Sequence, residues 1–522
     1  SREGFYDYAR YREAASTVQL WIRSLSCGAF PGQFAPGGHA LEPDGLFSLS
    51  SLADLTDPEV LGRVVGPLRE YYREVLFPEL ARRQPRLVGI NITYASQLPY
   101  ALWLLRELRE LLPESLLVCG GTEVSGVWKY LGDRGNMGRL FAGADACVVG
   151  EGETAFLRLL EAASAGRKPE PAPNTVLFDR ATAECTPPPG IHYENLEELP
   201  TPDYTLMRSD LYFSPHTMVY YSPTRGCYWN KCTFCDYGLN FGTPTSPWRQ
   251  RSVERTVEDL RAISRQTPYV YLSVDVLAPR SILAVAEGIA EAGIDVRWSA
   301  EIRLERYFDR ERCEMLARSG CAAVSVGFES GSQRILNRIR KGTDLEQIRT
   351  TVRNFAAAGI AVQMMGFTGF PTETRDEAMA SVAYLQECEE HWTVAGLGDF
   401  ALTPGAILAQ SPLEFGLFNV RPLRGEDIHR TLHYQEVPRP AKSPAERREV
   451  ARAKQSLGRA EFDRPWAGGI DTAHSLFYYS EYGRSFPGQV LPAALQGGMP
   501  EGQALALNGV LLEEERFDLL AL

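Results

Sequence analysis

The sequence has few cysteines and histidines and no long apolar run. Ten cysteines and seven histidines among 522 residues are too few for a fold built on disulfides. No stretch approaches the roughly 18 consecutive apolar residues of a membrane-spanning helix. Residues 1–12 are polar and aromatic, whereas a signal peptide begins with a basic region and continues with an apolar one. We therefore expect a cytoplasmic protein that does not cross a membrane.

Basic residues are outnumbered by acidic ones. The 54 lysines and arginines against 66 aspartates and glutamates give a formal net charge of -12. Sequence-independent binding to nucleic acid needs a basic face that displaces counterions from phosphates, so this balance argues against a nucleic-acid partner. With 44% hydrophobic and 23% charged residues, the chain has the composition of a folded protein. Its length predicts more than one domain, because one core seldom organises more than about 250 residues.

Two different patterns precede the middle of the chain. Residues 1–80 are mainly helical in pattern and are predicted to form an N-terminal cap. In residues 81–190, short apolar runs at 87–93, 116–119 and 146–149 alternate with helical spacing. This alternation predicts an α/β domain with a Rossmann-like, doubly wound parallel sheet. Its ligand site is expected at the carboxyl ends of the strands.

A second series of strands and helices follows a proline-rich linker at residues 191–210. Repeated β-α units over residues 211–420 predict a full or partial TIM-type barrel, whose functional residues lie on the loops after the strands. Residues 421–522 are predicted to form an α-rich C-terminal domain on the substrate side. The predicted barrel strands are residues 218–221, 270–274, 296–300, 323–328 and 361–367.

Three cysteines, Cys227, Cys232 and Cys235, lie close together on the loop after the first predicted barrel strand. Thiolates at this spacing suit zinc or an iron-sulfur cluster. A structural zinc site needs four protein ligands, and the nearest other cysteine and histidine in the sequence are Cys185 and His216. On a four-iron cluster, three cysteines leave one iron open to a substrate. Zinc stays as the alternative.

The cysteine loop resembles that of the radical S-adenosylmethionine (SAM) superfamily. The family motif is Cys-x3-Cys-x2-Cys with an aromatic residue before the last cysteine, here Phe234, although the first gap in this chain holds four residues. Residues 327–331, Gly-Phe-Glu-Ser-Gly, and residues 366–374, Gly-Phe-Thr-Gly-Phe-Pro-Thr-Glu-Thr, resemble the family motifs of the fourth and fifth barrel strands. The resemblance implies that the cysteines hold a [4Fe-4S] cluster whose open iron binds SAM.

The same resemblance implies where SAM is held. SAM carries an ammonium, a carboxylate, ribose hydroxyls and an adenine, so its site needs polar groups at the strand ends and an apolar shelf. The alternative for these residues is a set of structural ion pairs in the barrel mouth. The implied SAM contacts are Phe234, Asp275, Glu301, Arg303, Glu329 and Ser330.

A doubly wound domain directly before the barrel resembles the cobalamin-dependent branch of the superfamily. Segments 93–99, 120–125 and 149–153 carry this resemblance. Glycines let backbone amides approach a large ligand, and helix N-termini favour its phosphate. No histidine stands in an Asp-x-His-x-x-Gly motif, so cobalt is expected without a histidine ligand and with residues 94–97 against its lower face. The implied cobalamin contacts are Thr93, Tyr94, Ser96, Gln97, Gly120, Gly121, Thr122, Glu123, Gly150, Glu151 and Gly152.

Two other uses of this domain stay open. One is a nicotinamide site, which the turn at residues 120–123 disfavours because it lacks the Gly-x-Gly-x-x-Gly spacing. The other is a sheet that has lost its cofactor and only docks the barrel.

The resemblance implies an enzyme that uses both cofactors for C-methylation. In such enzymes one SAM yields a 5′-deoxyadenosyl radical, and a second SAM supplies the methyl group through cobalamin. We expect methylation at an unactivated carbon of a peptide or a small natural-product intermediate, with flavodoxin or ferredoxin as electron donor. The alternatives are a non-methylating cyclisation or rearrangement and, more distantly, a zinc-bound interaction protein without catalytic activity.

Overall fold

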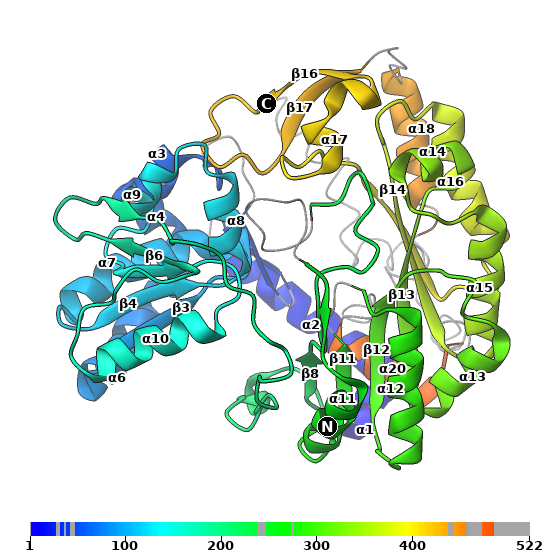
Figure 1. Ribbon diagram of the computed structural model, residues 1–522, viewed down its shortest axis with the longest axis horizontal. Helices are drawn as coiled ribbons and strands as arrows, with labels where there is room; N and C mark the ends of the chain where they lie inside the picture. The colour runs from blue at the N-terminus through cyan, green and yellow to red at the C-terminus, as the bar shows by residue number, and fades with distance from the viewer. Residues whose placement is uncertain are drawn as a thin grey trace.

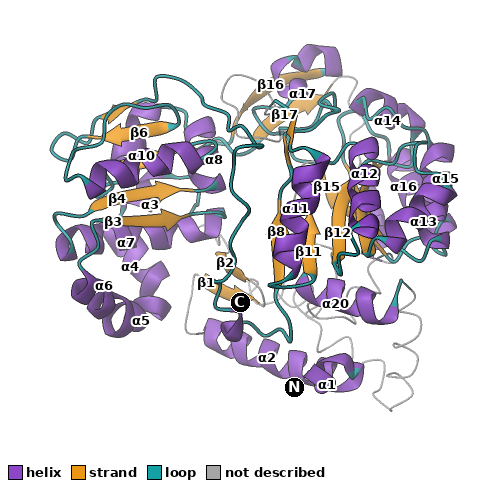
Figure 2. Cartoon of the chain, turned by 60° about the horizontal axis from the view of Figure 1, so that its bottom comes forward, coloured by secondary structure: helices purple, strands orange, loops and turns teal. Residues whose placement is uncertain are grey.

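Two α/β units face each other across the centre of the molecule (Figure 1). A hairpin near the end of the described chain lies above both, and helices near the two termini lie below the second unit (Figure 2). No helix in the described ranges combines the length and hydropathy that a membrane span requires. The computed structural model describes residues 2–27, 32–35, 38–41, 47–236, 247–272, 276–436, 443–455, 457 and 472–484.

The first unit is built on a five-stranded sheet in the order β3-β4-β5-β6-β7. β3, β4 and β5 are parallel, and β6 and β7 continue the sheet antiparallel. Helices α4 and α7 bury Leu61 and Leu105 on one face of the sheet, and α10 buries Leu159 on the other. Its elements are β3 (Leu87–Asn91), α7 (Leu98–Leu111), β4 (Leu116–Gly120), α8 (Thr122–Tyr130), α9 (Met137–Leu140), β5 (Ala146–Val148), α10 (Glu153–Ser164), β6 (Thr175–Phe178) and β7 (Cys185–Thr186). Short elements precede it: β1 (Gly32–Ala35), β2 (Gly38–Leu41), α3 (Leu52–Thr56), α4 (Pro58–Val65), α5 (Arg69–Tyr71) and α6 (Phe77–Arg83).

The second unit is an open barrel of six parallel strands in the order β8-β11-β12-β13-β14-β15. β8 and β15 are its two edges, so the barrel is partial, and the predicted α/β fold class is confirmed. The sixth strand was not predicted, because Gly396 and Gly398 interrupt its apolar pattern. Its strands are β8 (Met218–Tyr221), β11 (Tyr269–Leu272), β12 (Arg297–Ile302), β13 (Cys321–Glu329), β14 (Ala361–Thr368) and β15 (Val394–Asp399). The helices between them are α11 (Val253–Ser264), α12 (Pro279–Glu291), α13 (Arg310–Arg318), α14 (Gln333–Ile339), α15 (Leu345–Ala357) and α16 (Arg375–Glu387).

The amino-terminal ends of the barrel strands are closed by helices from both ends of the described chain. Helices α2 (Tyr8–Cys27) and α20 (Ala473–Tyr482) contribute Tyr11 and Phe477 to a buried aromatic cluster, and Phe5 of α1 (Arg2–Tyr6) packs against it. The His474 ring bonds the Tyr11 hydroxyl at 3.1 Å through Nδ1. This closure leaves the opposite end of the barrel, where the strands end, for ligands.

A carboxyl-terminal segment ties the two units together above the barrel. The backbone amide of Gly132, just after α8, donates to the Asp427 carbonyl at 2.9 Å, and Leu131 pairs with Ile428 in a β-bridge. Arg430 forms an ion pair with the buried Glu123. The elements of this part are α17 (Ile407–Gln410), β16 (Leu417–Pro422), β17 (Leu432–Glu436) and α18 (Pro444–Gln455).

Candidate cofactor site between the two units

The three neighbouring cysteines lie on a loop, residues 226–236, that follows β8 and the two-residue strand β9 (Thr224–Arg225). Gly226 begins the loop with φ of 78°, a conformation that glycine adopts at little cost. The loop is held by the buried Thr233, whose amide donates to the Ile339 carbonyl and whose carbonyl accepts from the Leu408 amide, both at 2.9 Å. We call this segment the cluster loop.

The donor set of the cluster loop fits an iron-sulfur cluster better than a single metal ion. Cys227, Cys232 and Cys235 are not joined in disulfides, and each is partly exposed. A structural zinc site needs a fourth protein ligand, whereas a four-iron cluster held by three cysteines keeps one iron open to a substrate. Burial raises the pKa of the Cys232 thiol, while the charges of Lys341 and Arg303 act in the opposite direction. These two cations stand where an anionic thiolate cluster needs compensation.

Arg303, directly after β12, and Glu329, the last residue of the adjacent strand β13, both contact Lys341. The Arg303 guanidinium lies 3.8 Å from the centre of the Trp229 ring and donates to the Lys341 carbonyl at 2.5 Å. Its Nε is buried and has no hydrogen-bond partner among the described residues, so one donor is left for a ligand. Glu329 accepts from Lys341 at 2.6 Å and has a left-handed backbone, φ 66°, at a β-bulge. Such strained positions gather at ligand sites.

The other predicted SAM contacts have varied surroundings. Glu301 accepts a hydrogen bond from the Tyr271 hydroxyl at 3.0 Å. The buried Ser330 hydroxyl lies 3.3 Å from that of Ser381 on α16 and accepts from the Ser332 amide. Phe234 packs edge-on against Phe367 at 4.9 Å. Asp275 lies outside the described residues. Contact of these residues with SAM stays a prediction.

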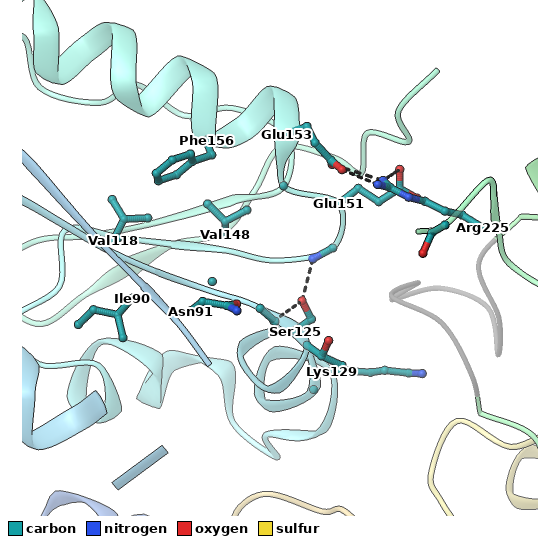
Figure 3. Close-up of a pocket in the computed structure, with 18 of the residues that line it drawn as sticks. Ile90, Asn91, Val118, Ser125, Lys129, Val148, Glu151, Glu153, Phe156 and Arg225 are labelled. Carbon is teal, nitrogen blue, oxygen red and sulfur yellow. Dashed lines mark hydrogen bonds and ion pairs between the residues drawn. The ribbon is translucent and has the colours of Figure 1, made fainter. Parts of the chain in front are cut away.

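A cavity of about 860 Å³ lies between the first unit and the cluster loop (Figure 3). Ile90, Val118, Val148 and Phe156 gather at one end of it, and Arg225 at the other (Figure 3). From the first unit it is lined by Gly89, Ile90, Asn91, Val118, Gly120, Gly121, Thr122, Ser125, Gly126, Lys129, Tyr130, Val148, Gly150, Glu151, Gly152, Glu153 and Phe156. From the barrel unit it is lined by Ser222, Thr224, Arg225, Gly226 and Asp236.

Two glycines shape the wall of the cavity at the carboxyl ends of β4 and β5. Gly121 has φ of 104°, and a Cβ there would lie 2.4 Å from the Asn91 Oδ1 atom. Gly150 has φ of 83°, and its amide donates to the Ser125 hydroxyl at 2.9 Å. Helices α8 and α10 begin directly after these turns. Their N-terminal amides and dipoles favour a phosphate at the cavity wall.

Six of the predicted cobalamin contacts line this cavity, namely Gly120, Gly121, Thr122, Gly150, Glu151 and Gly152. The other five, Thr93, Tyr94, Ser96, Gln97 and Glu123, are not among its lining residues. The Gln97 side chain accepts from the Thr93 and Tyr94 amides and so caps the short 3-10 turn at Ala95–Gln97, which precedes α7. The Tyr94 side chain is 67% exposed. Glu123 is occupied by Arg430.

The sequence did not reveal a contact that joins the first unit to the cluster loop. Asp236, the residue after Cys235, accepts hydrogen bonds from Lys129 and Tyr130 at the end of α8. It also accepts from the Gly405 amide at 3.0 Å. Burial and the bond to Asp236 raise the pKa of Tyr130. No local pattern marks Lys129 or Tyr130, because their partner is more than 100 positions away in the chain.

The barrel, the cysteine loop at its mouth and the motifs at residues 327–331 and 366–374 together agree with a known family. Residues 221–385 match the model of the radical SAM superfamily. These residues therefore form a radical SAM domain. A radical SAM domain implies a [4Fe-4S] cluster and SAM as cofactors, which confirms that part of the sequence-based expectation.

Several named relatives of this radical SAM chain are methyltransferases. An uncharacterized methyltransferase of Pyrococcus horikoshii is 30% identical over 254 residues, which cover 47% of this chain and 53% of that protein. The hopanoid C-3 methylase of Methylococcus capsulatus is 28% identical over 280 residues, 52% of this chain and 51% of that protein. The chain therefore spans about half the length of each of these relatives.

Two solved structures share the two-unit fold. TsrM from Kitasatospora setae, a radical SAM methyltransferase with cobalamin and a [4Fe-4S] cluster bound, gives a TM-score of 0.59 at 16% identity, covering 82% of this chain and 92% of TsrM. The cobalamin-dependent radical enzyme OxsB, with aqua-cobalamin bound, gives 0.57 at 14% identity, covering 87% of this chain and 78% of OxsB. At these identities the likeness is one of fold.

Proposed function

We propose that this radical SAM chain is a cobalamin-dependent methyltransferase that acts on an unactivated carbon of a peptide or a small natural-product intermediate in the cytoplasm. One observation carries the proposal. A single cavity reaches from the glycine turns at Gly120 and Gly150 to Gly226, the residue before the first cysteine of the cluster loop. A cofactor in this cavity lies directly beside the cluster loop.

The cavity has the properties that a corrin with a phosphate-bearing tail requires. Its volume of about 860 Å³ is within the range of large cofactor pockets. Val118, Val148 and Phe156 offer an apolar surface for a flat macrocycle. The turns at Gly121 and Gly150 present backbone amides at the start of two helices for the phosphate. No histidine is among the lining residues, so the described wall offers cobalt no imidazole.

In this proposal the chain's own residues bind SAM and hold the cluster loop beside the cavity. When bound, the cluster supplies the electron that cleaves SAM, and cobalamin supplies a transferable methyl group. Arg303, with its unpaired Nε, suits the SAM carboxylate, and Glu329 offers an acceptor at the adjacent strand end. The bonds from Lys129 and Tyr130 to Asp236 hold the cluster loop against the cavity, which fixes the distance between the two cofactor sites.

The ratio of two products tests methylation. With reduced enzyme, SAM and a peptide or small-molecule substrate, we expect 5′-deoxyadenosine and S-adenosylhomocysteine in a 1:1 ratio. Each turnover consumes one SAM to form the radical and a second SAM to supply the methyl group. A cyclisation or rearrangement yields deoxyadenosine without S-adenosylhomocysteine, and that result contradicts the proposal. In a Cys232→Ala control, deoxyadenosine formation is expected to disappear.

A further inference from the structure

The carboxyl end of helix α14 lies directly against the cluster loop. A helix leaves its last four backbone carbonyls without partners inside the helix, and a buried carbonyl without a partner costs free energy. In α14 the first two of these four accept from the amides of Arg340 and Lys341, which follow the helix. The other two belong to Arg338 and Ile339, and their partners must come from elsewhere in the fold.

The cluster loop supplies those partners. The Thr233 hydroxyl donates to the Arg338 carbonyl at 3.1 Å, and the Thr233 amide donates to the Ile339 carbonyl at 2.9 Å. The Trp229 indole N–H donates to the next carbonyl, that of Arg340, at 2.9 Å. Three consecutive carbonyls at the end of α14 therefore accept from the loop that carries the three cysteines.

These contacts hold the loop on both sides of Cys232. Trp229 precedes this cysteine by three residues, and the fully buried Thr233 follows it directly. A Cβ at Gly342 would lie 2.3 Å from the Trp229 ring, so the ring packs directly on the glycine backbone. Asn230 has a left-handed backbone, φ 46°, which asparagine adopts more readily than most residues. The backbone around Cys232 is thereby held by contacts that do not involve the cysteine sulfurs.

The turn after α14 also contacts the two residues proposed to bind SAM. The Lys341 carbonyl accepts from Arg303 at 2.5 Å, and the Lys341 ammonium donates to Glu329 at 2.6 Å. The Arg303 guanidinium lies 3.8 Å from the centre of the Trp229 ring. The end of α14 is therefore a common support for the cluster loop and for two residues at the ends of barrel strands.

We propose that the end of α14 gives the cluster loop its shape before the cluster is inserted, with Thr233 and Trp229 as positioning residues. The loop is then ordered when the cluster binds, so the affinity for the cluster is not reduced by the cost of ordering the loop. This inference depends on the radical SAM domain and uses neither cobalamin nor methyl transfer.

Hydrogen exchange of the full-length protein, stripped of its cluster by a chelator under anaerobic conditions, tests the shape of the loop. The Thr233 amide donates to the Ile339 carbonyl, and the Leu408 amide donates to the Thr233 carbonyl. We expect these two amides to exchange at least about 100-fold more slowly than in an unfolded chain. Exchange of both at the unfolded-chain rate overturns the proposal, because the loop would then take its shape from the cluster.

Variants at the two positioning residues test the contacts themselves. Thr233→Val removes the hydroxyl at nearly constant volume and leaves the Arg338 carbonyl without this donor. We expect the exchange of residues 226–236 in the cluster-free protein to become about tenfold faster, the effect of one lost buried hydrogen bond. Thr233→Ser keeps the hydroxyl and should restore slow exchange. Trp229→Phe keeps a ring but removes the N–H donor, and a smaller increase is expected at this half-buried position.

The matched control is Thr175→Val in the first unit. Thr175 is also a buried threonine, and its hydroxyl donates to the Pro173 carbonyl at 3.3 Å. This change removes a bond of the same kind far from the cysteines in the sequence, so the exchange of residues 226–236 should stay as in wild type.

Cluster assembly gives a second readout. With ferrous iron and sulfide added anaerobically, the visible absorption of the cluster should appear about tenfold more slowly in Thr233→Val, because the receptive loop shape is less populated. Thr233→Ser and Thr175→Val should assemble the cluster at the wild-type rate. Wild-type exchange and assembly in Thr233→Val, or equal losses in Thr175→Val, overturn the proposal. Iron without cobalt in wild type overturns the proposed function instead, because neither experiment uses cobalamin.

Discussion

The Arg225 guanidinium donates to the Glu151 carboxylate at 2.9 Å, across the junction of the two units. Arg225 stands two residues before Cys227, and Glu151 stands in the Gly-Glu-Gly-Glu turn after β5. Arg249 bonds the same carboxylate, and the Glu194 amide donates to it at 2.8 Å. Arg225 also pairs with Glu153. Glu151 therefore acts as an anchor for the cluster loop, in addition to lining the cavity.

Removing the charge of Glu151 is expected to loosen the junction in a pH-dependent way. Burial raises the pKa of the Glu151 carboxyl, but hydrogen bonds from Arg249 and the Glu194 amide and the charge of Arg225 hold it below 4.5. The pKa of Glu151 is lower in the folded protein than in the unfolded chain. The Glu151 carboxylate therefore stabilises the fold above the unfolded-state pKa, and this stabilisation is lost as pH falls through the folded-state pKa.

At pH 7 we expect Glu151→Gln to lower the free energy of unfolding of the cluster-free protein by about 2 kcal/mol, because the partly buried Arg225 and Arg249 lose the buried carboxylate that they share. Urea unfolding over a pH series checks this, and the difference from wild type shrinks below about pH 4.5. The control Glu258→Gln removes an exposed ion pair on α11 and changes stability by less than about 1 kcal/mol. A difference that persists unchanged into acid contradicts the assignment.

Lys129→Met tests the contact beside the last cysteine. The Asp236 carboxylate is almost fully buried and loses its cationic partner in this variant, which costs about 1.5–3 kcal/mol locally. We expect the cluster to be lost faster than in wild type on exposure to air. The decay of its visible absorption measures this loss. Lys168→Met, at an exposed lysine on the same unit, should decay at the wild-type rate.

Gly121→Ala tests the turn that shapes the cavity wall. The new Cβ would lie 2.4 Å from both the Asn91 Oδ1 atom and the Ile92 carbonyl oxygen, on a backbone with φ of 104°. We expect a loss of about 1–3 kcal/mol in the stability of the first unit. Hydrogen exchange of β3 and β4 measures it. Gly190→Ala, where nothing lies within 4 Å of the new Cβ, is the control.

Arg303→Met tests the role of the unpaired guanidinium donor. If Arg303 binds the SAM carboxylate, the dissociation constant for SAM rises at least about tenfold, because a charge-assisted hydrogen bond contributes about 1.5–3 kcal/mol. Isothermal titration of the cluster-loaded protein with SAM gives this value. Arg306→Met, at an exposed arginine three residues on, should bind SAM as wild type does. Equal affinities would leave Arg303 with a structural role.

The sequence predicted the parts of the site that depend on local chemistry. The strand of residues 218–221 and the cysteine loop after it were placed correctly, since a β-branched, aromatic run followed by a glycine turn is a local signal. The turns at Gly121 and Gly150 were found because only a special backbone calls for glycine there. Cavity residues such as Asn91 and Lys129 were missed, since folding brings them together from distant segments.

The same limit explains the predicted contacts that do not line the cavity. Gln97 looked like a ligand residue at the end of a strand, but its side chain caps the Thr93 and Tyr94 amides. Glu123, one residue beyond the glycine turn, pairs with Arg430, more than 300 positions away in the chain. A side chain at a strand end thus has several local and distant partners available, and the sequence alone does not choose among them.

The most direct measurement of the central claim is iron and cobalt analysis of protein purified anaerobically with iron and cobalamin supplied. We expect about four irons and one cobalt per chain in wild type. Gly126→Leu should keep the iron and lose the cobalt, because this glycine lines the cavity with nothing within 4 Å of a Cβ, and its new side chain fills the space. Gly190→Leu should keep both. Wild type with full iron and no cobalt, or Gly126→Leu with full cobalt, would contradict a cobalamin site in this cavity.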